Sequence, residues 1–383
     1  MKQLVLLYWG SVFLMYLSQV YYPSEVQLDS CQISKRHFLL RRADIFIIIV
    51  IAWLTCFSFL RTNYNDTANY IFFWRNAGTI KDFLESGGLL DLTGNPLSML
   101  WQALSHDLSS NYHIYFFPPA VLISLSTIKL FKQYSVNPAF SLLIFFSIGT
   151  YILYMAALKQ CLAMFFLLIS IPYAEKKQYI RFYILVFIAI LFHTHAFMFA
   201  IIPFLFEKPW GKITWLGLAI VLFAMATYDS TLGAFMEYAQ SIGALVDESE
   251  LFDGHQINTL RVIVYWIPPL LALIFRNRLF HDSSRMENLY VNMSIVGAFI
   301  LMIGMVQGAN LYARMAGYFE IMTALALPWM IKKVFDKRSA ELITAIACVC
   351  YFGYFCYEFG VSKSFGQQYR AISLWQFIVE LFA

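Results

Sequence analysis

The chain has 383 residues, of which 60% are hydrophobic and only 13% are charged, and its formal net charge is +4. A soluble domain carries about 25% charged residues, so this chain cannot cover a water-facing surface of its own size. The composition therefore excludes a soluble enzyme and a disordered protein, and the small, scattered positive charge excludes a nucleic-acid binder. It predicts an integral membrane protein, whose solvent is largely membrane lipid.

The apolar segments predict an all-α, polytopic membrane protein with about 11–12 transmembrane helices, because each crossing needs about 20 mostly apolar residues. Segments of this kind are 3–22, 43–60, 112–131, 138–157, 159–174, 212–228, 261–275, 288–306, 311–331 and 339–357. A longer segment, 178–206, is interrupted at His193-Thr194-His195. We interpret it as two short helices joined by a turn, and one long tilted helix is the alternative.

The positions of the basic residues predict the topology. Most of the 27 Lys and Arg residues lie in alternate loops, and the positive-inside rule assigns such loops to the cytoplasm. Both termini then lie outside, provided that segment 178–206 crosses twice. We predict one polytopic domain over residues 1–383. Its predicted non-cytoplasmic parts are two loops, at 61–111 and 229–260, and the C-terminal tail, at 358–383.

The two predicted outer loops differ in character. Within residues 88–107, apolar side chains recur at helical spacing and predict an amphipathic helix at the outer membrane interface, through Leu97, Leu100, Trp101 and Leu104. The second loop carries a solvated acidic surface formed by Glu237, Asp247, Glu248, Glu250 and Asp253.

The sequence contains no nucleotide-binding or metal-binding motif, since P-loop, GxGxxG, HExxH, GxSxG and DxD patterns are all missing. Its six cysteines form no CxxC pair, so neither a zinc site nor a redox pair is predicted. We expect no cofactor and no metal, and an enzyme of this composition would take its donor from the membrane.

The stretch from Arg61 to Arg75 follows the outer end of the second predicted span. If it is helical, Asp66, Asn69, Tyr70 and Phe73 share one face. The carboxylate, the amide and the aromatic rings of that face suit a sugar. Arg61 at the membrane edge suits a phosphate, because a guanidinium donates two parallel hydrogen bonds. The alternatives are that both arginines snorkel at the interface and that Asp66 caps a helix.

Two further cations lie near the predicted outer boundary. Lys159 opens the fifth span, where it is either an interfacial anchor or a phosphate contact. Arg314 lies about one turn inside the outer boundary of the predicted span 311–331, and an arginine at the membrane centre costs about 2.5–3.5 kcal/mol. An anionic partner would offset the smaller cost at this depth. Glu320, two turns deeper, is either neutral or the partner of another basic residue.

His193 and His195 lie inside a segment without Asp, Glu, Lys or Arg, from Phe182 to Phe206. Ionisable residues deep in apolar segments are candidates for function. Histidine titrates near neutral pH, so either ring could accept a proton from an attacking hydroxyl. A structural role and a metal-binding pair are the alternatives, although no third metal ligand accompanies the two rings.

Taken in order, these motifs resemble those of the EpsG/Wzy polysaccharide polymerases. The resemblance extends over residues 61–330 and rests on Arg61, Asp66, Thr67 and Tyr70, on Lys159-Gln160, on Phe192-His193-x2-Ala196, and on Arg314-x3-Tyr318 ahead of Leu327-Pro328. The sequence departs at Lys159, where arginine is commoner, and at His195, where a small hydroxyl residue is usual. The second departure leaves open which histidine acts.

The resemblance implies a multi-pass glycosyltransferase of the bacterial inner membrane, similar in fold to the all-helical, GT-C-like lipid-sugar transferases. Its substrates would be oligosaccharide repeat units on undecaprenyl diphosphate, which it would join on the periplasmic side into O-antigen or exopolysaccharide. The resemblance also implies two partners, a flippase and a chain-length regulator.

We expect an acceptor sugar hydroxyl to attack the anomeric carbon of a lipid-linked donor. His193 would accept the proton, with Asp66 or His195 as alternatives. The diphosphate would contact Arg314, Arg61 and Lys159, and the sugar would contact Asn69 and Tyr70. Arg75 and Tyr318 are further expected substrate contacts. Other classes that stay open are a flippase or sugar transporter, an O-antigen ligase, a membrane acyltransferase and a structural membrane subunit.

Overall fold

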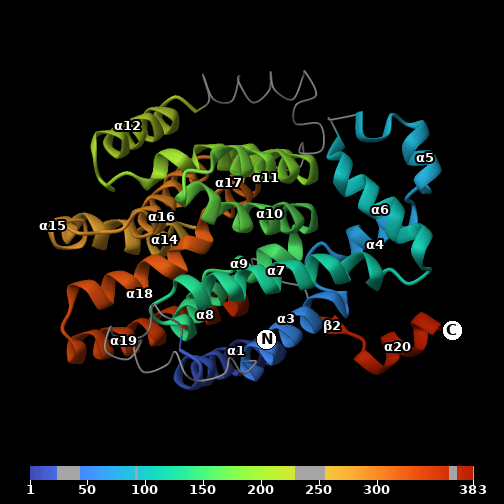
Figure 1. The fold of residues 1–383 in the computed structure, drawn as a ribbon, viewed down its shortest axis with the longest axis horizontal. Helices are drawn as coiled ribbons and strands as arrows, with labels where there is room; N and C mark the ends of the chain where they lie inside the picture. Colours follow the sequence, from blue (N-terminus) through green and yellow to red (C-terminus); the bar gives the residue numbers. More distant parts are fainter. Residues whose placement is uncertain (24–43, 91–93, 229–254, 362–368, 383) are drawn as a thin grey trace. The chain divides into compact units, whose positions relative to one another are not determined.

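The computed structural model describes residues 1–23, 44–90, 94–228, 255–361 and 369–382. In these ranges nearly all regular structure is helical (Figure 1). The acidic residues predicted for the second outer loop, at 237–253, lie outside the described residues.

Five described helices are long and apolar enough to cross a membrane, namely α1 (Lys2–Tyr21), α7 (His113–Tyr134), α10 (Leu158–Glu175), α16 (Arg285–Ile303) and the continuous helix Lys337–Val361, which comprises α19 (Lys337–Cys356) and η8 (Tyr357–Val361). A bent pair, α8 (Pro138–Ser147) and α9 (Thr150–Ala156), makes a sixth candidate, with an angle of 56° between the two helices. Gly149 lies at the bend with a φ of 84°, a left-handed conformation that favours glycine. The prediction of an all-α, polytopic membrane protein is confirmed.

Shorter apolar helices account for most of the other predicted spans. They are α3 (Ile45–Phe59), α11 (Tyr179–Phe192), η4 (Thr194–Phe206), α12 (Lys212–Ala226) and α14 (Thr259–Ile274). The predicted interruption of segment 178–206 is confirmed, because α11 ends at Phe192 and η4 begins at Thr194. The predicted double crossing of the membrane stays a prediction.

The remaining elements are short. They are β1 (Arg61–Asn63), α4 (Thr67–Arg75), α5 (Ile80–Glu85), η2 (Gly88–Leu90), α6 (Pro96–Leu108), α15 (Arg276–Leu279), α17 (Ala309–Ala316), η7 (Glu320–Met322), α18 (Thr323–Val334), β2 (Arg370–Ala371) and α20 (Leu374–Phe382). The amphipathic helix expected within residues 88–107 is present as α6. The predicted span 311–331 is not one helix, because Gly317 caps α17 and the chain turns before η7 and α18.

The chain forms two compact units, and each is described by itself. Unit 1 comprises Met1–Ile171, Ile180–Phe197 and Glu341–Ala383. Its centre is a helical layer in which α1 packs on α3 and α8, and α3 packs on α7. At the start of α3, Asp44 forms an ion pair of 3.2 Å with Lys132, whose ammonium also donates to the Ser18 hydroxyl. The opposite end of α3 leads into Arg61.

Aromatic residues and the C-terminal segment enclose this second end of α3. β2 pairs antiparallel with β1, and the Tyr369 ring stacks on Phe57 with 4.0 Å between centroids. Farther along, Phe377 of α20 packs edge-on against Phe59 at 5.1 Å. Phe377, near the end of the sequence, therefore shares one apolar cluster of unit 1 with residues from Phe59 to Leu158.

Unit 2 comprises Pro172–Tyr179 and Met198–Ala340, and it is built around α16, which packs against α12, α14, α17 and α18. α16 also supplies hydrogen-bond donors to the backbone carbonyls at the end of η4. The Asn292 amide donates to the carbonyls of Leu205 and Glu207, both at 2.7 Å, and Asn288 donates to that of Phe206 at 3.2 Å. Carbonyls at a helix end need such partners when water is excluded.

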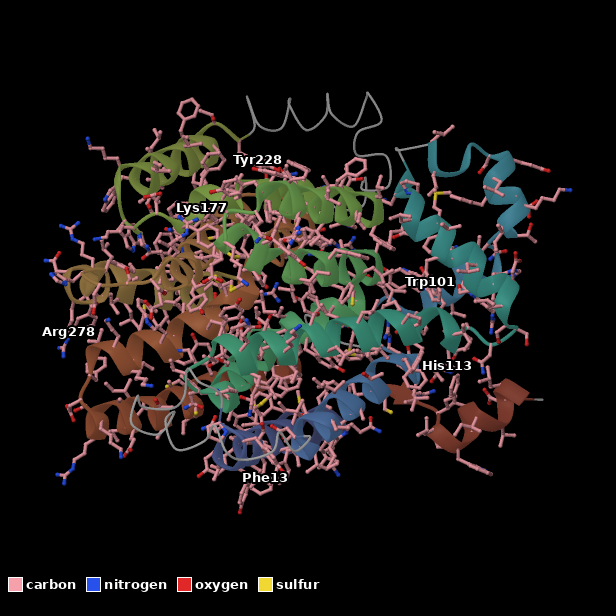
Figure 2. The ribbon with its side chains drawn as sticks, viewed as in Figure 1. Phe13, Trp101, His113, Lys177, Tyr228 and Arg278 are labelled. Atoms are coloured by element: carbon pink, nitrogen blue, oxygen red, sulfur yellow. The ribbon has the colours of Figure 1, made fainter. Side chains whose placement is uncertain are left out.

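Large apolar side chains remain exposed along the helices, as a membrane protein requires. Phe13 on α1 is 60% exposed and points outward (Figure 2), and Phe223 on α12 is 65% exposed. In water such surfaces would be a liability, whereas lipid tails solvate them.

We predict that Phe377→Ala releases the C-terminal segment from unit 1. The ring is 8% exposed, and truncation of a buried aromatic residue costs about 3 kcal/mol. Limited proteolysis of the protein in lipid nanodiscs should cut before α20 faster than in the unmodified protein. Gln376→Ala, which removes only an exposed bond to Glu380, is the control. Equal cleavage of the two variants would show that Phe377 does not fasten this segment.

Candidate functional site

Among the described residues of unit 1, Arg61 is the most enclosed charged residue, with an exposed fraction of 0%. Its Nε donates to the Thr67 hydroxyl at 2.9 Å, and Nη1 donates to the carbonyl of Ser58. Nη2 donates to the carbonyl of Met155 at 2.9 Å, at the end of α9. The guanidinium carbon lies 4.4 Å from the ring centroid of Phe116, a cation–π contact.

These contacts give Arg61 a clear structural task. Its donors tie together the end of α3, the start of α4 and the end of α9. Protein acceptors therefore surround the group expected to hold a phosphate, and a phosphate would have to displace them. The snorkelling alternative for Arg61 does not describe this arrangement, because the side chain points into protein. Arg75, at the end of α4, is exposed.

Tyr70 contacts the same junction between α9 and α10. Its hydroxyl accepts a hydrogen bond of 2.9 Å from the backbone N–H of Leu158. Leu158 immediately precedes Lys159, which is half-buried. Arg61 and Tyr70 therefore hydrogen-bond the chain on either side of the junction between α9 and α10, at Met155 and at Leu158. These bonds fix where α10 begins.

The predicted helix after Arg61 is confirmed as α4, and it begins directly after Asp66. The Asp66 carboxylate occupies the position of a cap without accepting a capping hydrogen bond, so the capping alternative fails for its side chain. Asn69 is exposed, whereas Tyr70 is half-buried. α4 therefore presents polar groups at the same end of unit 1 as Arg61.

The two histidines form a compact turn between α11 and η4. Their ring centroids are 5.2 Å apart, and the side chains of His193 and His195 are 7% and 6% exposed. Asn95, just before α6, holds this turn from outside. Its Oδ1 accepts from the backbone N–H of Thr194 at 2.8 Å and from the Thr194 hydroxyl at 3.0 Å.

A second contact from α6 supports the same turn. The Ser98 hydroxyl donates to the carbonyl of Phe192 at 2.6 Å. On its other side, the Phe192 ring stacks on Phe166 of α10, with 5.3 Å between centroids and 16° between planes. α6 and α10 therefore both position the turn that carries His193.

α6 is in turn fixed to α4 and α7. Gln102 donates to the carbonyl of Phe73 at 2.7 Å, and the Trp74 indole donates to the Ser105 hydroxyl at 3.1 Å. Trp101 donates to the carbonyl of Tyr115 at 3.1 Å, close to the start of α7 that His113 marks in Figure 2. The motif after Arg61 and the histidine turn, far apart in sequence, are thus linked through one helix of unit 1.

In unit 2 the polar residues of the predicted span 311–331 lie in and directly after α17. Arg314 is half-buried at the end of α17, and the Tyr318 side chain is 0% exposed. Glu320 is 5% exposed, hydrogen-bonded to Tyr265 of α14 and attracted by Arg261. Both roles expected for Glu320, a neutral group or an internal partner of a basic residue, are compatible with this arrangement.

The supporting residues Asn95, Ser98 and Tyr265 were missed by the sequence analysis. Asn95 did give a local signal, because an asparagine before a proline often starts a helix. That signal indicates where a helix starts. It does not indicate that the Asn95 side chain accepts hydrogen bonds from Thr194, which belongs to a different segment.

A model of the EpsG family matches residues 44–371 of this chain. Comparison with curated proteins and with solved structures gives no match.

We predict that Arg61→Lys lowers the stability of the protein. A lysine cannot reach the Thr67 hydroxyl and the Met155 carbonyl together, and each buried polar group left unpaired costs about 1–3 kcal/mol. Thermal unfolding in nanodiscs should shift to lower temperature, whereas Arg278→Lys, at an exposed arginine, should leave it unchanged. An unchanged unfolding temperature for Arg61→Lys would remove the structural task assigned to Arg61.

We predict that Asn95→Gly loosens the histidine turn and that Asn95→Asp does not. Asn95 has a φ of 57°, which glycine adopts readily and aspartate tolerates, but only aspartate keeps the acceptor for Thr194. Hydrogen exchange at the Thr194 amide should be about fivefold to tenfold faster in the glycine variant, as loss of about 1 kcal/mol implies. Equal exchange in the two variants would refute this role.

Proposed function

Because this chain belongs to the EpsG family, we propose that it joins oligosaccharide repeat units carried on undecaprenyl diphosphate. The reaction is a glycosyl transfer on the periplasmic side of the bacterial inner membrane. The observation that carries the proposal is the family match over residues 44–371, since every residue given a role below lies in that range. Membership of this family indicates an activity of the polysaccharide-polymerase type.

The proposed reaction replaces one bond of the anomeric carbon by another. A hydroxyl of the acceptor sugar attacks that carbon, and the bond from the carbon to the diphosphate oxygen breaks. The oxygen keeps the electron pair, and undecaprenyl diphosphate leaves. The acceptor proton passes to His193 and then to solvent, while Asp66 and His195 remain the alternative bases.

Cations stabilise the charge that develops on the leaving diphosphate. We propose this role for Lys159 and for Arg314, and we propose Tyr318 as a further substrate contact. Arg61 takes a different role from the one expected, that of a positioning residue. Its bond to Met155, together with the bond from Leu158 to Tyr70, sets the start of the helix that carries Lys159.

The α4 surface supplies contacts to the sugars in this proposal. Asn69 is exposed there, Asp66 lies one helical turn earlier, and Arg75 ends the helix. A carboxylate and an amide accept and donate hydrogen bonds as sugar hydroxyls require. A flippase that delivers repeat units and a chain-length regulator are the proposed partners, and membrane lipids surround the helices.

We predict that His193→Ala and Arg314→Ala, tested separately in cells, abolish long polymer while single repeat units are still capped. General base catalysis contributes about 10²-fold to 10⁴-fold, so chain length should collapse at normal protein level. His281→Ala and Arg278→Ala, at exposed residues, are the matched controls and should give normal chains. Normal polymer in both test variants would overturn the residue assignments.

A reconstitution experiment tests the reaction class itself. Purified protein in liposomes should elongate lipid-linked repeat units without moving them across the bilayer. Transbilayer movement without elongation would make the protein a transporter and end the polymerase proposal.

A further inference from the structure

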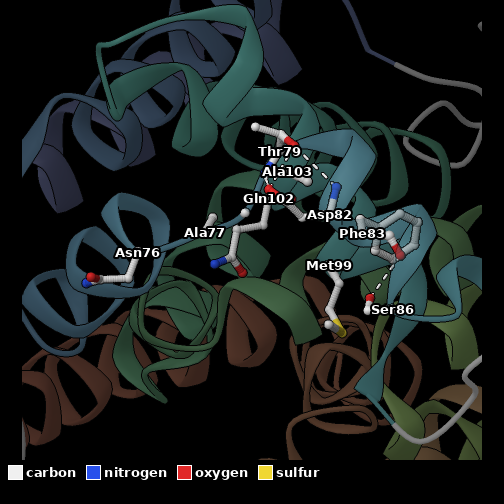
Figure 3. A pocket seen from close by; sticks show the side chains of 10 residues that line it. Asn76, Ala77, Thr79, Asp82, Phe83, Ser86, Met99, Gln102 and Ala103 are labelled. Atoms are coloured by element: carbon white, nitrogen blue, oxygen red, sulfur yellow. Dashed lines mark hydrogen bonds between the residues drawn. The ribbon is translucent and has the colours of Figure 1, made fainter.

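A groove of about 360 Å³ lies in unit 1 between α5 and α6, next to the end of α4 (Figure 3). Its lining contains neither Arg61 nor any residue of the histidine turn. Its lining includes both polar and apolar side chains, chiefly Asn76, Thr79, Asp82, Phe83, Met99 and Gln102.

Two amides line the groove with hydrogen-bonding capacity to spare. Gln102 uses one N–H on the Phe73 carbonyl at 2.7 Å, and Asn76 uses one on the Phe72 carbonyl at 2.8 Å. Within the described part of the chain, the Oδ1 and Oε1 atoms of these amides accept no hydrogen bond. The bonds already made hold the amides in place, so a ligand would meet preoriented acceptors and donors.

Asp82 adds a fixed carboxylate. Its Oδ2 accepts from the backbone N–H of Thr79 at 2.7 Å and from the Thr79 hydroxyl at 2.8 Å, as Figure 3 shows. These two bonds lower the pKa of Asp82, so the group is an anion at neutral pH. No lysine or arginine belongs to the described lining, and an uncompensated carboxylate disfavours a phosphate or diphosphate.

Apolar surface completes the groove. Phe83 is 7% exposed and Met99 is 39% exposed, so a ring and a thioether border the polar groups. Acceptors and donors beside apolar patches match a ligand that carries hydroxyls around an apolar ring face. The ligand class that fits is a neutral sugar.

α6 connects the groove with the histidine turn. Asn95, Met99 and Gln102 follow one another at helical spacing and share one face, and the rise from the first to the last is about 10 Å. Asn95 holds Thr194, and Ser98, which holds Phe192, directly precedes Met99. A glycan lying in the groove would therefore run along the helix that positions the histidine turn.

We propose that this groove binds neutral sugar units of the glycan at a distance from the reacting sugar. The inference rests on the proposed function, because it treats the histidine turn as the reacting end. In this proposal α6 sets the distance between the sugar units bound in the groove and the glycosidic bond that forms.

Elongation kinetics in nanodiscs test the proposal with two different variants. Met99→Trp fills the groove without removing any hydrogen bond, and Asn76→Ala removes an amide that bonds the Phe72 carbonyl one turn earlier in the chain. Each should raise KM for the lipid-linked repeat unit about tenfold, the effect of about 1.4 kcal/mol, with kcat within about twofold of the unmodified value, because binding and not chemistry is altered. Lys81→Ala, on α5 but outside the lining, is the control. An unchanged KM in both groove variants would overturn the proposal.

A binding experiment separates this proposal from the polymerase itself. The probe is the repeat-unit oligosaccharide released from its lipid and diphosphate, followed by saturation-transfer NMR with the protein in nanodiscs. Binding that Met99→Trp abolishes supports the groove even if the protein fails to elongate, in which case only the proposed function falls. Elongation together with oligosaccharide binding that Met99→Trp leaves intact would refute the groove and leave the polymerase standing.

Discussion

A guanidinium enclosed in protein requires acceptors for its donors, since arginine keeps its proton and a buried unpaired charge is costly. In unit 1, Arg61 obtains these acceptors from three separate stretches, represented by Ser58, Thr67 and Met155. The end of α3, the start of α4 and the end of α9 are therefore held at one point. The candidate sugar and phosphate contacts lie on α4 and at the start of α10, so their placement depends on this charge.

α6 extends that order to the histidine turn. Its first residues hold Thr194 and Phe192, and farther along it is bonded to α4 through Gln102 and Ser105. The expected task of this helix was to lie along the membrane interface, and Trp101 still agrees with an interfacial position. Its contacts show an additional task, because one helix connects α4, which carries the candidate sugar contacts, with the turn that carries the proposed base.

The helices and the interruption before Thr194 could be predicted, because the length of an apolar segment and a polar interruption in it are properties of consecutive residues. The bond from Arg61 to Met155 could not be predicted, because Met155 is 94 residues away and offers only a backbone carbonyl, which every residue has. The task of Asn95 was hidden for the same reason, since its partner Thr194 lies 99 residues farther along. Residue type alone indicated that Arg61 mattered, but only the fold shows that its donors face inward.

The pairing of β1 with β2 has a consequence for biogenesis. The Tyr369 hydroxyl donates to the carbonyl of Phe57 across 312 residues of chain. At a synthesis rate of about 5–20 residues per second, the ribosome needs about 15–60 s to make that stretch. During this interval the end of α3 is already in place while its strand partner does not yet exist. Unit 1 therefore closes late, and a nascent chain arrested before β2 should present an open strand edge to the insertion machinery.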